Sequence, residues 1–494
     1  MINRFKKYKR FSYLGVTAGI MLSITSCVPS LSEKTASKEV PGNYHNSQDS
    51  LATKSFNSAD TTSSASIDWK TFFDDPNLIA LIDTALENNQ ELNIMLQELK
   101  VAQSEVQARK GEYLPSIGLK AGAGVDKVGK YTRDGAVEEN LEIIEGKAFP
   151  DPLPDYMIGL NAQWEVDIWN KLHNAKKSAV MRYLSSVEGR NFMVTNLIAE
   201  IANSYYELLA LDNQLQIVKN NIEIQERAYR IVKLQMQAAR VTQLAVSKFN
   251  AEVLHTKSLQ YDIQQRITET ENKLNFLVGR YPQPIARSTE AFATMLPKQI
   301  DAGLPAQLLQ NRPDIRQAEF ELQASKLDIK VAKARFYPSF GISANIGYQA
   351  FNPDYLLNTP ESLIYSVAGD LVAPLVNRNA IKAAYKTANA KQIQAAFDYE
   401  QTVLKAYIEV ANQLSKIDNL KKSYDLRAAE VDALTESIKI SNKLFRNARA
   451  EYMEVLMTQR DALESKFDLV ETKMQQMTAV VNMYQALGGG WNKD

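Results

Sequence analysis

The stretch that decides the fold is residues 211–279, LDNQLQIVKNNIEIQERAYRIVKLQMQAARVTQLAVSKFNAEVLHTKSLQYDIQQRITETENKLNFLVG. It has no proline, and its only glycine is its last residue. Apolar side chains recur three and four residues apart, which is the spacing of one buried helix face. They predict two long antiparallel helices with two seams: Leu215, Val218, Ile222, Tyr229, Val232 and Met236, with polar Gln225 in one slot, and then Val246, Phe249, Val253, Ile263, Ile267, Leu274 and Leu277.

The helical pattern extends beyond this stretch. From about Lys176 to Ala238 and from about Thr242 to Leu277 there is no proline and almost no glycine. The second half of the chain shows the same spacing at Val431, Leu434, Ile438 and Phe445. A helix of roughly 60 residues is about 90 Å long, which exceeds the diameter of a globular domain. We therefore expect a rod or a tube.

The two halves of the chain repeat one unit. The matching segments are Tyr113-Leu114-Pro115-Ser116 with Phe336-Tyr337-Pro338-Ser339, Ser204-Tyr205-Tyr206-Glu207-Leu208 with Ala406-Tyr407-Ile408-Glu409-Val410, and Phe276-Leu277-Val278-Gly279 with Gln485-Ala486-Leu487-Gly488. The second copy is about one heptad longer, which leaves the seam of a coiled coil in place. We expect a first repeat at 67–280 (strands about 114–169, helical hairpin about 171–279), a second at 281–488 (strands about 336–376, hairpin about 378–487) and a C-terminal tail at 489–494.

Four segments of about ten residues alternate loosely between apolar and small or polar residues. They are residues 116–125, 156–164, 340–348 and 363–371. Ten residues is about the length of a tilted transmembrane strand, although soluble hairpins would show the same pattern. Four strands cannot close a barrel, since the smallest transmembrane barrels have about eight. If these strands span a bilayer, the chain must oligomerise.

The N-terminus favours the membrane interpretation. Residues 1–12 contain five basic side chains and no acid, and an apolar run from Leu14 to Ile24 follows. This is the pattern of a signal peptide, which we place at 1–26. The sequence Ile24-Thr25-Ser26-Cys27 is typical of a lipobox, so we expect acylation of Cys27, the alternative being a buried free thiol. Residues 27–66 are rich in Ser, Thr, Ala and Asn and predict a flexible lipoprotein tether.

The composition excludes several classes of protein. With 57 basic and 57 acidic residues the chain lacks the positive excess of a nucleic-acid binder. One cysteine and three scattered histidines form neither a disulfide framework nor a zinc motif. There is no nucleophile elbow, Walker loop or HExxH. We expect no enzyme activity, no cofactor, no metal and no nucleic-acid partner.

Several motifs in one order resemble the TolC-type outer-membrane efflux proteins, in the lipid-anchored branch that serves resistance-nodulation-division (RND) pumps. They are Glu165-Val166-Asp167-Ile168-Trp169-Asn170-Lys171-Leu172, Gly303-Leu304-Pro305-Ala306-Gln307-Leu308-Leu309 followed by Arg312-Pro313-Asp314-Ile315, Ala373-Pro374-Leu375-Val376-Asn377, and Ala486-Leu487-Gly488-Gly489-Gly490-Trp491. The resemblance covers about 69–491, nearly the whole mature chain.

The resemblance implies a mainly α fold with a β part. Long antiparallel helical hairpins would form a periplasmic α-barrel, and four transmembrane strands per protomer would complete a 12-stranded β-barrel in a homotrimer. Such a trimer would lie in the lipid of the cell outer membrane and act as a passive exit duct for drugs or other small molecules, delivered by an inner-membrane RND-type pump and a periplasmic membrane-fusion adaptor. A different possibility is a periplasmic coiled-coil scaffold lipoprotein that conducts nothing; two barrel-length strand pairs argue against it.

The resemblance also implies two sites on the helical hairpins. Ala239-Arg240-Val241 and Ala448-Arg449-Ala450 match the periplasmic turns at which the family docks its adaptor, and the family usually has Gly in place of both alanines. Six residues after each alanine the family often has an acid at the narrow end of the tunnel; here Ala245 and Glu454 stand there, and Met457 occupies a further acidic position.

Three copies of Glu454 would form a ring that favours cations, and Arg446 or Arg449 could pair with it to hold the tip closed. The alternative for Glu454 is a solvated surface residue. Phe445 lies on the seam with Ile438, so it is a candidate for either the gate or the packing of the tip.

Overall fold

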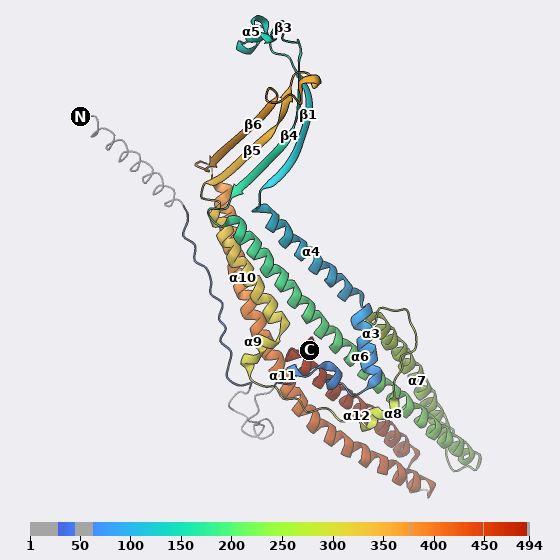
Figure 1. Ribbon diagram of the computed structural model, residues 1–494. Helices are drawn as coiled ribbons and strands as arrows, with labels where there is room; N and C mark the ends of the chain where they lie inside the picture. The colour runs from blue at the N-terminus through green and yellow to red at the C-terminus, as the bar shows by residue number, and fades with distance from the viewer. Residues whose placement is uncertain (1–27, 45–62, 377, 448, 492–494) are drawn as a thin grey trace. The chain divides into compact units, whose positions relative to one another are not determined.

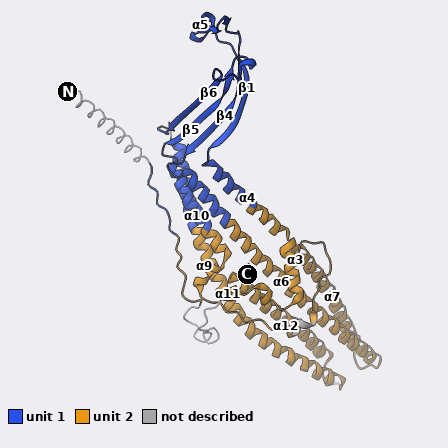
Figure 2. Cartoon of the chain, in the orientation of Figure 1, with its two compact units in different colours: residues 1–35, 100–184, 320–396 blue, residues 36–99, 185–319, 397–494 orange. Residues whose placement is uncertain are grey.

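The computed structural model describes residues 28–44, 63–376, 378–447 and 449–491 (Figure 1). The expected signal peptide, Cys27 and Ala448 lie outside the described residues, so the predictions for them stay predictions. The chain divides into two compact units, unit 1 with residues 1–35, 100–184 and 320–396 and unit 2 with residues 36–99, 185–319 and 397–494 (Figure 2). Each unit therefore takes segments from both halves of the sequence.

Unit 1 contains a four-stranded antiparallel sheet with the strand order β1-β4-β5-β6. The predicted strands are confirmed, with small extensions at their ends. Their bounds are Ser116–Asp126 for β1, Leu153–Val166 for β4, Ser339–Ala350 for β5 and Leu363–Val372 for β6. Pairing of β4 with β5 joins the two hairpins that the sequence predicted into one sheet.

The long polar loop between β1 and β4 has structure of its own. It contains α5 (Arg133–Asn140) and a small hairpin of β2 (Glu142–Ile144) and β3 (Lys147–Ala148). Helix α5 begins after Thr132, whose hydroxyl accepts a hydrogen bond from the Gly135 amide at 3.1 Å. The shorter loop between β5 and β6 has one 3-10 turn, η4 (Pro353–Tyr355).

The predicted long helices are confirmed. They are α6 (Lys171–Gln237), α7 (Gln243–Leu277), α11 (Asn379–Arg446) and α12 (Tyr452–Ala486). Within unit 2, α7 lies beside α6 and α12 lies beside α11 (Figure 1). In each hairpin an ion pair joins the two helices. Lys257 of α7 pairs with Glu226 of α6 at 2.6 Å, and Arg427 of α11 pairs with Asp468 of α12. The other helices are α2 (Trp69–Phe72), α3 (Pro76–Asn88), α4 (Gln90–Glu112), α8 (Thr289–Thr294), α9 (Leu308–Asn311), α10 (Pro313–Ala334), η2 (Ser64–Ser66) and η3 (Pro305–Gln307).

The seams predicted from the spacing form the interior of the helical hairpins. Val218 and Ile222 of α6 pack with Ile263 of α7, and Gln225 on the same seam is 1% exposed. Both amide atoms of Gln225 lack a hydrogen-bond partner within the described part of the protomer. The 3,4 spacing therefore identified the buried face correctly, including its polar interruption.

Each hairpin ends on a glycine that docks against another helix start. Gly279 has φ +77° and Gly488 has φ +89°, a region that favours glycine. A Cβ on Gly279 would stand 2.4 Å from the carbonyl oxygen of Asn88, just before α4. A Cβ on Gly488 would stand 2.5 Å from that of Asn311, just before α10. The same close approach thus occurs once in each repeat.

A buried arginine ties the second docking point together. The Arg312 side chain, 5% exposed, bonds to Asp314 at 2.6 Å, to Glu409 at 2.8 Å and to the carbonyl oxygen of Ala486 at 2.9 Å. Burial opposes its charge, but the bonds with Asp314 and Glu409 outweigh burial and raise the pKa of the guanidinium above its usual value. Elements α10, α11 and α12 are thereby joined by one side chain.

Part of the expected flexible tether is docked, which corrects that expectation for residues 28–44. In unit 1, Val28 and Leu31 pack against a buried cluster that includes Phe336 and Tyr385, and the Gln392 side chain bonds to both the amide (3.0 Å) and the carbonyl (2.6 Å) of Lys34. In unit 2, Lys38 pairs with Glu319 at 2.5 Å, and Tyr44 stacks on Tyr407 with ring centroids 5.5 Å apart. The segment has the polar composition of a tether, but these contacts hold it against the helices. We call residues 28–44 the strap.

Candidate functional site

The four-stranded sheet has one apolar face. Because residues directly opposite each other in antiparallel strands point to the same face, the register gives complete rows across the sheet. One row consists of Leu119, Leu160, Ile346 and Tyr365. These side chains are between 50% and 77% exposed. A neighbouring row of Ile117, Ala162, Ala344 and Val367 extends the same apolar surface.

The opposite face of the sheet is polar or small. Its corresponding row is Gly118, Asn161, Asn345 and Ser366, and the Asn345 amide lies 3.3 Å from the Ser366 hydroxyl. Alternation of a lipid-compatible face with a water-compatible face is what a strand lining an aqueous channel requires. The sheet can thus separate lipid from water.

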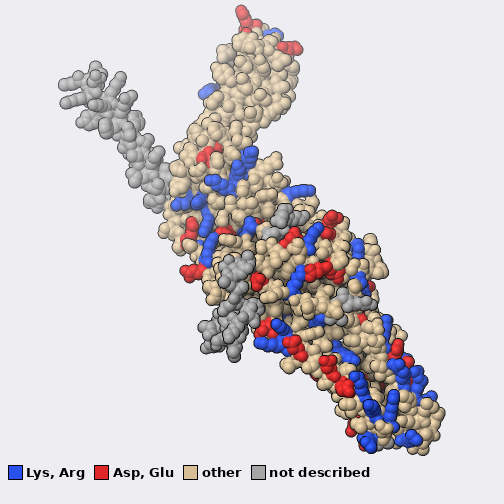
Figure 3. All heavy atoms as spheres, turned by 60° about the horizontal axis from the view of Figure 1, so that its bottom comes forward, with Lys and Arg blue, Asp and Glu red and all other residues tan. Residues whose placement is uncertain are grey.

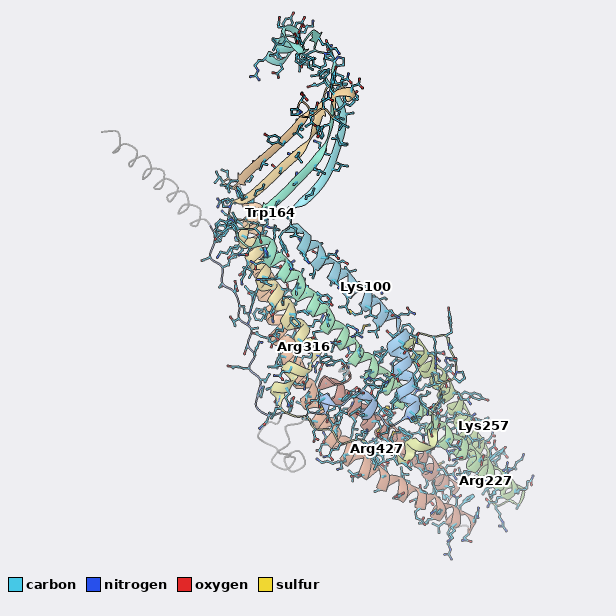
Figure 4. The ribbon with its side chains drawn as sticks, in the orientation of Figure 1. Lys100, Trp164, Arg227, Lys257, Arg316 and Arg427 are labelled. Carbon is cyan, nitrogen blue, oxygen red and sulfur yellow. The ribbon has the colours of Figure 1, made fainter. Side chains whose placement is uncertain are left out.

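Aromatic side chains gather where the strands give way to helices. Trp164, near the end of β4 (Figure 4), donates its indole N–H to the carbonyl of Tyr113 at 3.0 Å. Trp169 stacks on Tyr337 with centroids 4.7 Å apart and donates to the carbonyl of Pro338 at 2.8 Å. Tryptophan and tyrosine prefer the boundary between hydrocarbon and water. This end of the sheet therefore suits a membrane interface.

The first periplasmic turn keeps a glycine-type conformation on an alanine. Helix α6 ends at Gln237 and α7 begins at Gln243, so the turn lies where the sequence predicted it. Ala239 has φ +54°, the left-handed region that costs an L-residue about 1–2 kcal/mol. The Arg240 amide donates to the carbonyl of Gln235 at 2.9 Å, and Thr242 caps α7. Alanine thus takes the left-handed conformation at this turn.

The second turn closes with the matching hydrogen bond. Helix α11 ends at Arg446 and α12 begins at Tyr452. The Arg449 amide donates to the carbonyl of Leu444 at 2.9 Å, the same five-residue relationship as in the first turn. Arg449 and Ala450 are described, whereas Ala448 is not.

An apolar cluster packs the two turns together. Its buried members are Val232, Ala245, Val246 and Phe249 of the first hairpin and Leu456 of the second. Phe445 packs against this cluster, together with Val241 and Tyr452. The tips of the two hairpins therefore form one body within unit 2. Phe445 takes part in its packing, and a gating role for it stays a prediction.

Glu454 lies in the first turn of α12, and its side chain is exposed. Arg446 and Arg449 are exposed as well. Among the described residues of the tip, no ion pair joins Glu454 to either arginine. The closing pair and the ring of Glu454 therefore stay predictions that concern an assembly of several copies.

Neither a metal site nor a membrane-spanning helix is found in the described ranges. No group of three or more His, Cys, Asp or Glu side chains there is arranged to hold a metal ion. None of the described helices combines the length and the apolar character needed to cross a bilayer.

The sequence predicted the strands and the turns, but not the ion pairs that the Arg312 and Arg287 side chains make with distant carboxylates. Arg312 belongs to the motif Arg312-Pro313-Asp314-Ile315, but its partners Glu409 and Ala486 lie far away in the chain. Arg287 makes a similar half-buried clamp with Asp212 and Glu271, each at 2.5 Å, and it belonged to no motif. For Arg312 the sequence showed only an arginine before a proline at a helix start, and this pattern does not identify the groups that accept its hydrogen bonds.

Proteins similar to this chain in sequence are named for export or efflux. The pyoverdine export outer membrane protein OpmQ of Pseudomonas aeruginosa is 27% identical over 429 residues, covering 86% of this chain and 88% of that protein. The cation efflux system protein CusC of Escherichia coli O6:H1 is 25% identical over 474 residues, covering 96% and 98%. Both matches extend over nearly the full length of the relatives.

Solved structures show the same fold. The open state of the MtrE outer membrane channel of Neisseria gonorrhoeae superimposes with a TM-score of 0.80 at 21% identity, covering 95% of this chain and 99% of that one. A crystal structure of CusC gives a TM-score of 0.78 at 22% identity, covering 94% and 100%. The fold predicted from the resemblance is thereby confirmed.

The family itself follows from the sequence. A model of the outer membrane efflux protein family matches residues 81–280 and 304–489, which together make up most of the chain and fall one in each half of the repeat. We conclude that this chain belongs to the outer membrane efflux protein family.

Proposed function

We propose that three copies of this chain form a passive exit duct that completes a tripartite pump. As a member of its family the chain is an outer-membrane efflux protein. In the proposed assembly the sheets of three protomers join into a 12-stranded barrel, the helical hairpins extend into the periplasm as a tunnel, and an inner-membrane RND-type pump supplies the cargo.

The observation that carries this proposal is the pair of open edges of the sheet. In the described residues, β1 pairs only with β4 and β6 only with β5. Unpaired backbone groups cost several kcal/mol each in hydrocarbon, so an open sheet with an apolar face cannot remain alone in a bilayer. Pairing of β6 of one copy with β1 of the next satisfies both edges.

The helical tips supply the docking surface of the proposed assembly. The turns around Arg240 and Arg449 are exposed and packed together by one apolar cluster. We place the periplasmic adaptor at Ala239, Arg240 and Val241 and at Ala448, Arg449 and Ala450. Acyl chains on Cys27 would add a second attachment to the outer membrane.

The relatives differ in what their names say they export. Pyoverdine is named for OpmQ, cations for CusC, and solvent for the outer membrane protein SrpC of Pseudomonas putida, which is 26% identical and covered over 87% of its length. The names of the relatives therefore do not identify the solutes that this chain would export.

Purified full-length protein reconstituted in a planar bilayer tests the duct. We expect single-channel conductance, together with a light-scattering mass in detergent that corresponds to three chains. A monomer mass would contradict the edge-pairing argument. A trimer that never conducts, even after disruption of its tips by substitution, would instead favour the periplasmic scaffold.

A further inference from the structure

Positive charge is concentrated at the periplasmic turns. We call residues 230–250 and 439–459, ten on either side of Arg240 and of Arg449, the tip region. It holds only two acids, Glu451 and Glu454, in a chain whose basic and acidic residues are equal in number at 57 each. The eight basic residues of the tip region are Arg230, Lys233, Arg240, Lys248, Lys439, Lys443, Arg446 and Arg449.

The basic side chains of the tip region are accessible to solvent in a single protomer. All eight basic side chains are exposed. Within the described residues, Lys439 is the only one of the eight in an ion pair, 2.9 Å from Glu436. Of the next acids along the helices, Glu226, Glu436 and Asp461 pair with Lys257, Lys439 and Arg460, and only Glu252 is in no ion pair of the described residues. The positive excess is therefore not neutralised locally.

The charges also lie close together in space. Both hairpins contribute four of them, and the apolar cluster of Val232, Phe249 and Leu456 packs the hairpins against each other. Figure 3 shows Lys and Arg atoms gathered at this end of the hairpins, and Figure 4 places Arg227 and Lys257 toward the same end. One protomer thus presents a single electropositive surface.

We propose that the tip region makes the periplasmic opening of the duct select anionic solutes over cations. This inference rests on the proposed function, because only an assembled duct gathers three tip regions around one opening. It names a cargo class, solutes bearing carboxylate, sulfonate or phosphate groups. Its sign is opposite to the cation preference that a ring of Glu454 alone would give.

The balance of charges decides the sign. Three tip regions bring about 18 net positive charges to one opening, and a Debye length of about 8 Å at physiological ionic strength lets neighbouring charges act together. Rings of Arg and Lys are the usual means of anion selectivity in pores. Glu454 lowers this potential locally, but Lys248, one turn into α7, faces solvent from the adjoining hairpin.

The reversal potential of the full-length protein in a planar bilayer under a KCl gradient tests the proposal. We expect chloride to be more permeant than potassium by about threefold or more. The double variant Lys248→Gln with Lys443→Gln should lose at least half of that preference. The matched control, Lys330→Gln with Lys391→Gln, removes two exposed lysines of unit 1 and should leave the preference unchanged.

A second measurement covers a tip that is closed at rest. In detergent, at low ionic strength, the trisulfonate dye pyranine should bind the wild-type protein more tightly than cationic rhodamine 6G by fluorescence anisotropy. The Lys248→Gln, Lys443→Gln variant should weaken pyranine binding, and the control pair should not.

The outcomes separate the two proposals. Conductance with a preference for potassium, or pyranine binding that the tip variant and the control weaken equally, would overturn the anion selectivity and leave the duct standing. Permanent absence of conductance in a trimer with disrupted tips would overturn the duct, and the selectivity with it.

Discussion

Gly488 approaches Asn311 so closely that a Cβ on the glycine would stand 2.5 Å from the asparagine carbonyl oxygen. The backbone of Gly488 also lies in the left-handed region. Two independent reasons thus exclude a side chain at the point where α12 meets the start of α10.

Gly488→Ala should lower stability by about 2 kcal/mol or more, because either the backbone or Asn311 must move. The thermal unfolding midpoint of the detergent-solubilised protein, followed by far-UV circular dichroism, measures this loss. Gly111→Ala is the matched control, since a Cβ there meets nothing within 4 Å. Equal midpoints for the two variants would show that the docking point yields easily.

Loss of the Arg312 side chain should be among the most damaging single changes. Arg312→Met removes four hydrogen bonds to three partners and leaves Asp314 and Glu409 without their cation, at a cost of about 3–5 kcal/mol. Urea unfolding reports the loss. Arg427→Met breaks a pair in which the carboxylate is half exposed and should cost at most about 1 kcal/mol. A similar loss for both variants would contradict the clamp.

Ala239→Gly should stabilise the first turn by about 0.5–1 kcal/mol, because glycine adopts φ +54° without the steric cost that alanine carries. Ala238→Gly is the control: its amide still bonds to the carbonyl of Leu234 in helical fashion, so glycine there should destabilise. Thermal unfolding midpoints that move in the same direction for both variants would argue against strain at Ala239.

Glu454→Ala tests the predicted constriction. If Glu454 closes the tip by pairing with an arginine of another copy, resting conductance should rise; if it only filters, conductance should persist with a stronger preference for anions. Glu464→Ala, which removes an exposed acid of α12 outside the tip region, is the control. Conductance and selectivity equal to wild type would identify Glu454 as a solvated surface residue.

Cys27→Ser should abolish acylation and leave membrane insertion intact, because the sheet supplies the apolar contact with the bilayer. Mass spectrometry of the mature wild-type N-terminus should show a Cys27 that carries acyl chains. An unmodified Cys27 at that terminus would disprove the lipobox interpretation.

The sequence predicted those elements whose signal is local. The 3,4 spacing located α7 almost to the residue, and loose alternation located β1 and β6. Both patterns reflect which side chains one element buries or exposes, and that information lies within the element itself.

Contacts between distant segments could not be predicted in this way. The strap has a polar composition that indicates a solvated chain, and its seat depends on Gln392 and Tyr407, which lie more than 350 residues away. The acceptors of Arg312 are hidden for the same reason. The net charge of zero for the whole chain does not show the positive excess of the tip region, which appears only when the charges around the two turns are counted separately.

The two hydrogen bonds from Gln392 to the backbone of Lys34 limit how far Cys27 can lie from this point of the chain. Only six residues lie between Cys27 and Lys34, so seven steps of the chain join them, and each step of a fully extended chain covers at most about 3.6 Å. The Cα atom of Cys27 is therefore confined to within about 25 Å of the Cα atom of Lys34, whatever the conformation of the chain between them. Because Gln392 bonds to backbone atoms, replacing Lys34 by any residue except proline should keep this limit on the distance.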